Sequence, residues 1–469
     1  MRPRRVVIVG GGLAGIAAAL ECRKAGAGVT LLESRGRLGG AAFSFTREGI
    51  RADNGQHVFL RCCTAYRELL QEMGAAQLVT LQDRLSIPVL APGGRRARLT
   101  RSGLPAPLHL AATLARYPFL RPAQRASVTR AMLALRRIDF ASRTVDERSL
   151  GDWLREQRQD EESVQALWGL IVRPTLNLDP REASLAQAAQ VFQVGLLRDR
   201  AAGDIGYAQA PLSEIHDVAA RRTLLGSGVD VRLRHGATTI AHVAEGFRIE
   251  ISGAPTLTAD VVIVAVPPDR AGRVLPSAAG IDPGQLSRLG RSSIVNLHVV
   301  YDRRVMEVPF AAGVRTPVQW IFDRTESAGI DSGQYLVVSQ SAADAELEMT
   351  GEDLRRRYLP ALAELFPAAA QASVQAFFVT REHSATFRAA PGAQALRPGT
   401  RTRLPGLILA GSWTDTGWPA TMEGAVRSGR TAAQAALTAP LPEVEPQLDV
   451  PGVAARNGHA QPQFAERPG

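Results

Sequence analysis

Three glycines near the amino terminus have the spacing of a phosphate-binding turn. Gly10, Gly12 and Gly15 directly follow an apolar, β-branched run at 6–9. In such a turn the first glycine permits a tight bend, the second lets a pyrophosphate approach the backbone, and the third lets a helix pack closely on the strand. The free N–H groups at the start of that helix would bind the phosphates. The chemistry predicted here is therefore dinucleotide binding.

The elements that must position this turn are visible on either side of it. Residues 6–9 predict a strand buried on both faces, and residues 16–24 predict a helix. Residues 29–32 predict a second strand that ends at Glu33. Glu33 stands eighteen residues after Gly15 (33 − 15 = 18), where a carboxylate accepts hydrogen bonds from ribose hydroxyls. Its charge repels a 2′-phosphate, so NADP is disfavoured, while NAD and FAD both stay open.

The residues that follow Glu33 favour FAD. Two arginines and a glycine pair extend the phosphate-proximal surface, a pattern that resembles the fingerprint of the flavoprotein oxidoreductases that include amine oxidases and carotenoid desaturases. In that group an arginine usually follows the glycine pair, whereas this chain has Ala41. We predict FAD as the cofactor, bound on this side by Gly10, Gly12, Leu13, Ala14, Gly15, Glu33, Ser34, Arg35, Arg37, Gly39 and Gly40.

The segment 53–59, with the sequence DNGQHVF, allows two interpretations. A hairpin with an Asn54-Gly55 turn would leave His57 on the surface. Alternatively, the segment lies beside the flavin ring, where the related flavoproteins carry a similar D.G.H pattern, and His57 takes part in proton transfer. The sequence leaves both interpretations open.

A second glycine-containing stretch lies near the carboxyl terminus. Residues 407–410 predict a strand, Gly411 and Gly417 predict turns, and residues 421–433 predict a helix. In the flavin group this unit contacts the ribitol and the N1–C2 edge of the ring, and the helix N-terminus stabilises negative charge on reduced flavin. The aspartate usual after the first glycine is replaced by a serine, which still offers a hydrogen bond. The predicted cofactor residues here are Gly411, Ser412 and Met422.

The chain of 469 residues is too long for one hydrophobic core and predicts two interleaved domains. The predicted fold class is α/β, with a Rossmann-type FAD-binding domain interleaved with a substrate domain of mixed sheet and helices. Residues 148–198 predict a helical cap domain, with a capped helix start at Ser149 and aromatic residues that pack in the core. Residues 290–390 predict strands with one helix near 351–365. We assign 1–85, 211–275 and 396–438 to the FAD-binding domain, 86–210 and 276–395 to the substrate domain, and 439–469 to a disordered tail.

The composition is that of an ordinary globular protein, with 45% hydrophobic and 21% charged residues. No run of about 18 apolar residues predicts a membrane span, and the first strand begins too early for a secretory signal, so we expect a cytoplasmic protein. The three cysteines, Cys22, Cys62 and Cys63, lack metal-ligand spacing and suit a reducing compartment. No metal is therefore predicted.

The net charge of +10 is carried almost wholly by arginine, since Lys24 is the only lysine. No basic motif with interleaved aromatic residues is present, so we predict no nucleic-acid partner. The charge is better suited to attraction toward anionic lipid. Residues 104–120 are apolar and flanked by arginines, and predict either an interfacial segment at the inner face of the cell membrane or a core helix. The sequence does not predict an oligomeric state.

Several segments together resemble one narrower family, the hydroxysqualene dehydroxylases of bacterial squalene and hopanoid biosynthesis. The resemblance runs from residue 1 to about 437 and includes 411–429, GSWTDTGWPATMEGAVRSG. Its most specific parts are 53–59 and 414–424. The family's reaction reduces hydroxysqualene, a C30 polyprenyl alcohol, to squalene with loss of water, using a hydride from reduced flavin. The resemblance thus implies an apolar tunnel for a polyprenyl lipid.

The resemblance also implies roles for residues near the ring. His57 and Asp415 are the candidate catalytic residues, and Asn54, Gln56 and Trp418 are the candidate substrate-binding residues. The alternatives are a carotenoid or phytoene desaturase, a flavin amine oxidase and a non-catalytic FAD-binding subunit. The lysine that many amine oxidases place near the flavin has no counterpart, because the single lysine lies in the first predicted helix.

Overall fold

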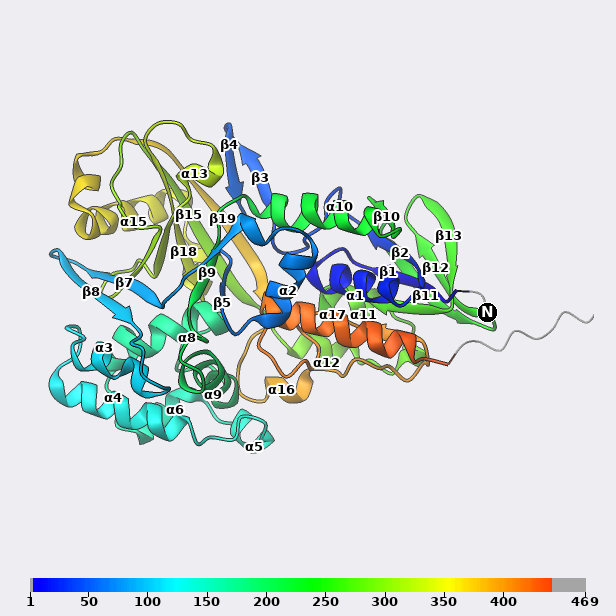
Figure 1. Cartoon of the computed structure of the whole chain (residues 1–469), viewed down its shortest axis with the longest axis horizontal. Helices are drawn as coiled ribbons and strands as arrows, with labels where there is room; N and C mark the ends of the chain where they lie inside the picture. Colours follow the sequence, from blue (N-terminus) through cyan, green and yellow to red (C-terminus); the bar gives the residue numbers. More distant parts are fainter. Residues whose placement is uncertain (1–2, 441–469) are drawn as a thin grey trace, which may run out of the picture.

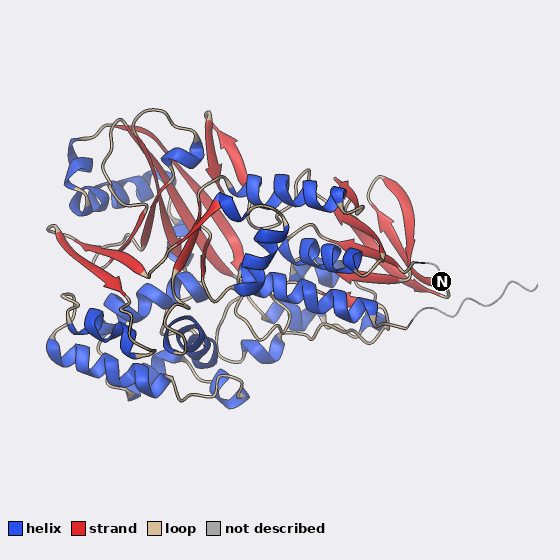
Figure 2. Cartoon of the chain, in the orientation of Figure 1, coloured by secondary structure: helices blue, strands red, loops and turns tan. Residues whose placement is uncertain are grey.

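A five-stranded parallel sheet forms the centre of the half of the molecule that contains the amino terminus (Figure 1, Figure 2). The computed structural model describes residues 3–440, so most of the predicted tail at 439–469 lies outside the described residues. All neighbouring strands of the sheet run parallel, and the central strands are almost fully buried, as their β-branched sequences predict. The strand order is β10 (Asp230–Leu233), β2 (Gly28–Glu33), β1 (Arg5–Val9), β14 (Val261–Val264) and β20 (Leu407–Leu409). The predicted α/β fold is confirmed.

Two helices from opposite ends of the chain pack against each other beside this sheet. Helix α1 (Leu13–Lys24) follows β1, and α17 (Met422–Leu437) follows β20. A Cβ added at Gly429 would lie 2.1 Å from the carbonyl oxygen of Ala14, so only glycine permits this close approach. Also packed near the sheet are α2 (Thr64–Glu72), α10 (Ala219–Gly226), α11 (Pro268–Val274) and the antiparallel strands β11 (Ala237–Val243), β12 (Gly246–Ile251) and β13 (Ala254–Ala259).

A seven-stranded sheet forms the other half of the molecule and joins two distant parts of the chain. Its order is β19 (Val374–Thr386), β15 (Ser292–Tyr301), β18 (Gln334–Ser341), β17 (Trp320–Asp323), β16 (Phe310–Gly313), β7 (Ser86–Ala91) and β8 (Arg95–Thr100). Residues on either side of the second dinucleotide-domain segment therefore share one sheet. The helix α15 (Gly351–Leu365) lies over it, at the predicted position. The domain boundaries themselves stay a prediction.

The helical region predicted at 148–198 is present, and it begins as predicted with a capped helix. Ser149 precedes α6 (Leu150–Glu156), and its hydroxyl accepts a hydrogen bond of 3.0 Å from the N–H of Asp152. Trp153, Trp168 and neighbouring aromatic rings pack in the core, which confirms a packing role. Besides α6, the α-helices between residues 111 and 192 are α3 (Ala111–Ala115), α4 (Pro122–Leu135), α5 (Arg143–Asp146), α7 (Glu161–Ser163), α8 (Gly169–Leu176) and α9 (Leu185–Phe192).

Two local predictions need correction. The hairpin β3 (Ser44–Arg47) and β4 (Ile50–Asp53) turns at Glu48-Gly49, both at positive φ, and not at Asn54-Gly55, which follow β4. Residues 104–120 do not form one helix: they divide into a loop, a short 3-10 turn and α3. Some of their apolar side chains enter the core, while others are exposed. The segment is therefore not simply a core helix, and the interfacial role stays a prediction.

Shorter elements connect these layers. The strands β5 (Val58–Leu60), β9 (Ile205–Ala208) and β6 (Val79–Leu81) form a small antiparallel sheet. Within residues 3–440, no helix is both long and apolar enough to cross a membrane. The remaining helices are α12 (Pro283–Arg288), α13 (Thr325–Ala328), α14 (Asp344–Glu348) and α16 (Ala393–Leu396).

Candidate active site

The glycine turn after β1 has the geometry of a phosphate cradle. Gly10 adopts a φ of 112°, and a Cβ there would lie 2.5 Å from the carbonyl oxygen of Ala265. A Cβ at Gly15 would lie 1.9 Å from the carbonyl oxygen of Gly10, so the helix packs directly on the turn. At Gly12, by contrast, a Cβ would meet only the Cα of Gly40, at 3.7 Å. The backbone of Gly12 is thus open to a ligand.

The first turn of α1 is free to bind an anion. No side chain caps this helix, and its first backbone hydrogen bond is donated by the N–H of Ile16 to the carbonyl of Gly12. The N–H groups of Leu13, Ala14 and Gly15 therefore have no intrahelical acceptor, and they point toward the helix N-terminus, where the macrodipole favours negative charge. This arrangement fits a pyrophosphate.

The carboxylate of Glu33 lies at the carboxyl end of β2, beside the glycine turn. One oxygen accepts a hydrogen bond of 2.8 Å from the N–H of Gly11, and the other accepts one of 2.8 Å from the N–H of Arg35. The Ser34 hydroxyl also donates to it, at 3.2 Å. Glu33 is buried, and backbone N–H donors hold its carboxylate at the position where a ribose would lie. This position fits the predicted role.

The loop with Gly39 and Gly40 returns to the glycine turn. Both residues have positive φ, and a Cβ at Gly40 would lie 2.9 Å from the Cα of Gly12. The guanidinium of Arg37 lies 3.5 Å from the ring centroid of Phe43 and donates to the carbonyl of Gly40 at 3.1 Å. Burial and the neighbouring Arg35 charge lower the pKa of Arg37 to about 10. Arg37 therefore braces the loop from inside the protein.

The carboxyl-terminal turn meets the same edge of the parallel sheet. The N–H of Gly411 donates to the hydroxyl of Ser428 on α17 at 2.8 Å, and the indole of Trp413 donates to the carbonyl of Val266 at 2.9 Å. Ser412 is half-buried after Gly411. Ligands of open α/β sheets bind in the crevice at the carboxyl ends of the strands, where these segments converge. The two predicted halves of the cofactor site are thus brought together.

A buried arginine that the sequence did not predict holds this turn. The guanidinium of Arg397 donates to the carbonyls of Ser412, at 3.1 Å, and Thr414, at 2.5 Å. Burial lowers the pKa of Arg397 to about 10. Because five N–H donors can serve several carbonyls at once, one arginine fixes a turn that has no regular backbone pairing. No local pattern around Arg397 distinguishes it from the many surface arginines.

The first turn of α17 is also fixed from the inside. Met422 begins the helix, half-buried, and Thr421 caps it by accepting from the N–H of Gly424 at 3.1 Å. The buried carboxylate of Glu423 accepts from the N–H groups of Ala65, at 3.2 Å, and Tyr66, at 2.8 Å, at the start of α2. An acid at a helix N-terminus is stabilised by the helix dipole.

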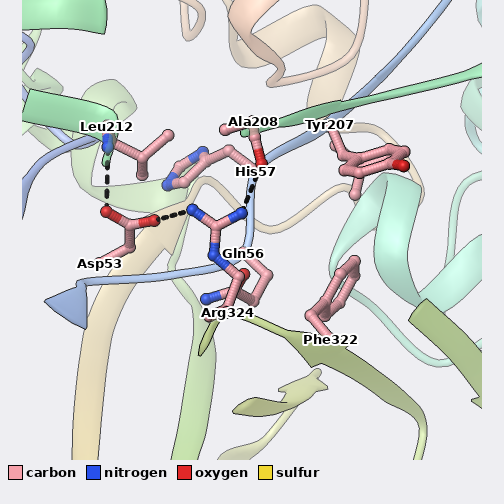
Figure 3. Close-up of a pocket in the computed structure, with 9 residues that line it drawn as sticks. Asp53, Gln56, His57, Tyr207, Ala208, Leu212, Phe322 and Arg324 are labelled. Atoms are coloured by element: carbon pink, nitrogen blue, oxygen red, sulfur yellow. Dashed lines mark hydrogen bonds and ion pairs between the residues drawn. The ribbon is translucent and has the colours of Figure 1, made fainter. Parts of the chain in front are cut away.

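His57 lines a narrow cavity between the small sheet and the seven-stranded sheet (Figure 3). Beneath it, the buried guanidinium of Arg324 pairs with Asp53 at 2.8 Å. The amide nitrogen of Gln56 is buried there and has no hydrogen-bond partner among the described residues. An orphaned donor of this kind marks a position where a ligand or a water can bind. The cavity is lined by Asp53, Gln56, His57, Val58, Tyr207, Ala208, Leu212, Phe322 and Arg324.

Burial disfavours the charged form of the histidines at this cavity. Burial lowers the pKa of His57, and the charge of Asp53 only partly opposes this effect. Burial also lowers the pKa of the neighbouring His216 to about 3, and His216 is hydrogen-bonded through Nε2 to the hydroxyl of Tyr66 at 2.8 Å. A neutral imidazole offers one N–H donor and one acceptor. His57 is half-buried and lines the cavity, so of the two interpretations left open by the sequence, the hairpin with a surface histidine does not hold.

Aromatic rings continue from this cavity along β16 and β17. The ring of Tyr207 contacts Phe310 edge-to-face, with 5.4 Å between the centroids. Phe310 in turn lies 6.1 Å from both Trp320 and Phe322. Tyr207 and Phe322 also line the cavity itself. The sequence did not predict this row, because it joins residues from three separate strands. Phe310 and Phe322 are buried in the core, so of this row Tyr207 and Phe322 are the rings that meet the cavity.

Asn54 lies beside the site, but its side-chain amide is hydrogen-bonded to other groups of the protein. Its amide nitrogen donates to the carbonyl of Ala41 at 2.9 Å and to Glu382 at 3.0 Å, and its amide oxygen accepts from the N–H of Phe43 at 3.0 Å. These contacts tie the cofactor loop to β19. Glu382 lies within β19, and this contact to Asn54 is part-buried. Asn54 as a substrate ligand stays a prediction.

Asp415 and Trp418 lie on the carboxyl-terminal turn rather than in the His57 cavity. Asp415 is exposed, and its carboxylate accepts a hydrogen bond of 2.6 Å from the amide of Gln394. Trp418 is half-buried, and the guanidinium of Arg427 lies 4.7 Å from its ring centroid. Their predicted roles as a catalytic residue and as a wall of the substrate site stay predictions.

Other chemistries find little support among the described residues. Within residues 3–440, no group of three or more histidine, cysteine, aspartate or glutamate side chains could hold a metal ion. Lys24 pairs with Glu21 and Glu72 at the carboxyl end of α1, far along the helix from the glycine turn. The lysine that many amine oxidases place near the flavin therefore has no counterpart among the described residues around the glycine turn.

Comparison with known proteins assigns the chain to a family. The family model described as flavin containing amine oxidoreductase matches residues 13–437. The hydroxysqualene dehydroxylases of Rhodopseudomonas palustris and Sinorhizobium fredii are 28% and 29% identical to this chain, over 93% of it and 99% of their own length. The probable zeta-carotene desaturase of Synechococcus elongatus is 26% identical, with the same coverage.

Solved structures share the fold at lower sequence identity. Putrescine oxidase bound to putrescine superposes with a TM-score of 0.68 at 22% identity, and cyclohexylamine oxidase from Brevibacterium oxydans with 0.67 at 22%. Each comparison covers 93% of this chain and 99% of the other. The glycine cradle, the open helix N-terminus and the converging carboxyl-terminal turn fit the flavin cofactor of this family. The chain therefore belongs to the flavin-containing amine oxidoreductases and is an FAD-dependent oxidoreductase.

Proposed function

We propose that this chain reduces hydroxysqualene to squalene, in the cytoplasm, as a step of bacterial squalene and hopanoid biosynthesis. The observation that carries the proposal is the full-length similarity to two proteins named hydroxysqualene dehydroxylase, at 28% and 29% identity. The two aromatic rings that line the His57 cavity, Tyr207 and Phe322, support a polyprenyl substrate, because aromatic side chains bind apolar chains and stabilise cations.

The reaction breaks one C–O bond and forms one C–H bond. The carbon accepts a hydride, the leaving hydroxyl accepts a proton and departs as water, and the substrate gains two electrons. Reduced FAD supplies the hydride when it is bound. The protein must therefore bind the polyene, exclude water from the reacting carbon and assist the departure of the hydroxyl.

His57 is the proposed residue at the hydroxyl. Its lowered pKa makes the ring mostly neutral at pH 7, so its main contribution is one N–H donated to the hydroxyl oxygen. The minor protonated form is a stronger acid than an ordinary histidine and can transfer a proton. The orphaned amide of Gln56 supplies a second donor in the same cavity. Asp415, on the carboxyl-terminal turn, remains the second proposed acid.

A carotenoid desaturase is the alternative, favoured by the similarity to the Synechococcus protein at 26% identity. Such an enzyme removes hydrogen from an apolar polyene and needs no donor at a hydroxyl. The buried polar groups at Gln56 and His57 favour an oxygenated substrate over a pure hydrocarbon, since an unpaired buried donor lowers affinity for a ligand that cannot satisfy it.

Product analysis tests the proposal. The FAD-loaded enzyme is incubated anaerobically with hydroxysqualene and excess dithionite, and the extracted lipids are identified by mass spectrometry. We expect squalene in amounts above one equivalent of enzyme, and none with enzyme stripped of FAD. Recovery of the unchanged alcohol, together with desaturation of phytoene by the oxidised enzyme, would establish the alternative.

A further inference from the structure

One segment of the chain is strongly basic. Residues 84–138 contain eleven arginines and neither aspartate nor glutamate. This segment forms β7, β8, α3 and α4, which lie together at the end of the molecule farthest from the amino terminus (Figure 1). The guanidinium of Arg95 donates to the carbonyl of Pro118 at 3.2 Å, and the hydroxyl of Thr113 donates to the carbonyl of Arg98 at 3.2 Å. Strand β8 and helix α3 therefore form one continuous surface.

A loop with exposed leucines lies within this basic surface. We call residues 102–109 the leucine loop; it is closed by a hydrogen bond of 2.8 Å from the N–H of Ser102 to the carbonyl of His109. Leu104 and Leu108 are 52% and 58% exposed, and Pro105 between them is exposed as well. Within residues 3–440 only five large apolar side chains are exposed in this way, and a third, Leu133 on α4, belongs to the same segment.

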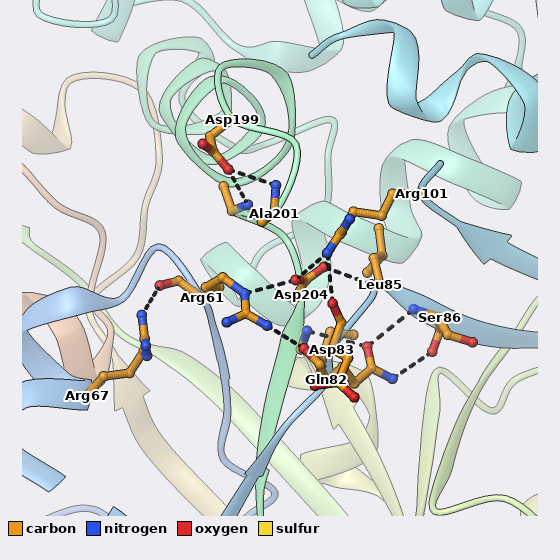
Figure 4. Close-up of polar contacts among 12 residues, drawn as sticks. Arg61, Arg67, Gln82, Asp83, Leu85, Ser86, Arg101, Asp199, Ala201 and Asp204 are labelled. Atoms are coloured by element: carbon orange, nitrogen blue, oxygen red, sulfur yellow. Dashed lines mark hydrogen bonds and ion pairs between the residues drawn. The ribbon is translucent and has the colours of Figure 1, made fainter. Parts of the chain in front are cut away.

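The base of the leucine loop is held rigidly (Figure 4). Asp204 is fully buried and forms ion pairs with Arg101, at 2.6 Å, and Arg61, at 2.8 Å. Arg200 donates to the carbonyl of Gly103 at 2.9 Å. Leu104 and Leu108 therefore lie on a loop whose base is anchored by ion pairs and a hydrogen bond.

The arginines around the leucine loop keep their charge available. Arg101 is neutralised by Asp204, but Arg95, Arg96, Arg98 and Arg116 are exposed and form no ion pair within the described part of the chain. Apolar side chains bordered by unpaired cations match the boundary between the headgroups and acyl chains of an anionic bilayer. A nucleic acid would use the arginines but gain nothing from two exposed leucines.

We propose that the leucine loop and its bordering arginines dock the protein on an anionic lipid bilayer. Leu104 and Leu108 enter the acyl boundary, while Arg95, Arg96 and Arg98 contact lipid phosphates. The proposal rests on this surface alone and does not depend on the proposed reaction, although an enzyme that takes a membrane-dissolved lipid would benefit from it.

Vesicle sedimentation tests the proposal. The full-length, FAD-loaded protein is mixed with vesicles of phosphatidylcholine containing about 30% phosphatidylserine, and with pure phosphatidylcholine vesicles. We expect binding to the anionic vesicles that falls at high salt. Leu104→Ser with Leu108→Ser, and separately Arg95→Gln with Arg96→Gln and Arg98→Gln, should each weaken it by at least about tenfold, since each buried leucine and each arginine contributes to partitioning.

Matched controls separate the surface from general effects. Leu225 is 55% exposed on α10, and Leu225→Ser should bind like the wild type. Arg222→Gln with Arg248→Gln and Arg273→Gln removes the same charge from exposed positions elsewhere and should also retain binding. FAD absorbance and melting temperature confirm that each variant is folded. The proposal is wrong if the wild type does not bind anionic vesicles or if the leucine variant binds them like the wild type. It is also wrong if the protein binds a short RNA or DNA duplex through these arginines but does not bind the vesicles.

Discussion

The carboxylate of Asp53 and the guanidinium of Arg324 form an ion pair of 2.8 Å inside the protein, with only 5% and 8% of their side chains exposed. Asp53 ends β4, next to the cofactor loops, and Arg324 follows β17 of the seven-stranded sheet. Asp53 also accepts a hydrogen bond of 3.0 Å from the N–H of Leu212, and Arg324 also donates to the carbonyl of Ala208. The pair therefore holds together the walls of the His57 cavity.

Removing one partner of this ion pair should lower the free energy of unfolding more than removing the charge of both partners. Arg324→Met leaves a buried, uncompensated carboxylate, and we expect a loss of about 3–5 kcal/mol in unfolding free energy. The double variant Arg324→Met with Asp53→Asn should recover part of that loss, because no buried charge remains. Arg303, paired with Asp302 at the exposed surface, provides the control, since solvent screens such a pair and Arg303→Met should leave the unfolding free energy nearly unchanged. Denaturant unfolding measures all three; equal losses for Arg324 and Arg303 would contradict the account.

Two glycines of the cradle should respond differently to the same added methyl group. Gly12→Ala makes only an ordinary van der Waals contact of 3.7 Å with the Cα of Gly40, so the apoprotein should keep its melting temperature. Its FAD affinity should fall by at least about tenfold, because the methyl group occupies the path of the pyrophosphate. Gly15→Ala places a methyl group 1.9 Å from a carbonyl oxygen and should destabilise the apoprotein itself. Gly226, which has nothing within 4 Å, provides the control. FAD titration and thermal unfolding of apoprotein measure both effects; unchanged FAD affinity in Gly12→Ala would argue against the cradle.

The lowered pKa of His57 predicts a characteristic pH profile. If His57 assists the hydroxyl as an acid, its protonated fraction keeps growing as the pH falls below 6.5, so the single-turnover rate should rise over that range instead of levelling off. His57→Gln should lower the rate by about 10²-fold or more and remove this dependence. His242, exposed on β11, provides the matched control His242→Gln. A full rate with His57→Gln and intact FAD binding would remove the role assigned to His57.

Two fully buried histidines should make the protein sensitive to acid. Burial lowers the pKa of His216 and of His298 to about 3, whereas an unfolded histidine titrates near about 6.5. The unfolded state therefore binds more protons below pH 6.5, and each histidine should remove about 1.4 kcal/mol of stability per pH unit from there down to about pH 3. Above pH 6.5 this loss does not occur, and the protein keeps its full stability. Thermal unfolding from pH 7.5 to 5 should show a shallower decline for His298→Gln than for the wild type, and equal declines for the two proteins would contradict this prediction.

The sequence predicted the elements whose causes are local. The glycine turn, the strand ending at Glu33 and the capped helix at Ser149 follow from spacing, β-branching and capping residues within a few positions. The hairpin at 44–53 was misplaced because Glu48-Gly49 and Asn54-Gly55 are both good turn sequences, and tertiary packing chose the first.

The parts of the site that could not be predicted depend on long-range contacts. Arg324 meets Asp53 across 271 positions of sequence, and Arg397 braces a turn through carbonyls rather than through a motif. Among 55 lysines and arginines, nothing in composition separates these two from surface residues. The packing of Gly429 on Ala14 is likewise invisible locally, because it joins the two ends of the chain.

The redox direction of a single turnover tests the central claim most directly. Enzyme with bound FAD is reduced stoichiometrically without oxygen, mixed with hydroxysqualene and followed at the flavin absorption band, and the lipids are then extracted. The account predicts reoxidation of the flavin with one equivalent of squalene formed per equivalent of flavin. A flavin that stays reduced with hydroxysqualene, while the oxidised enzyme is reduced by a polyene or an amine, would contradict it.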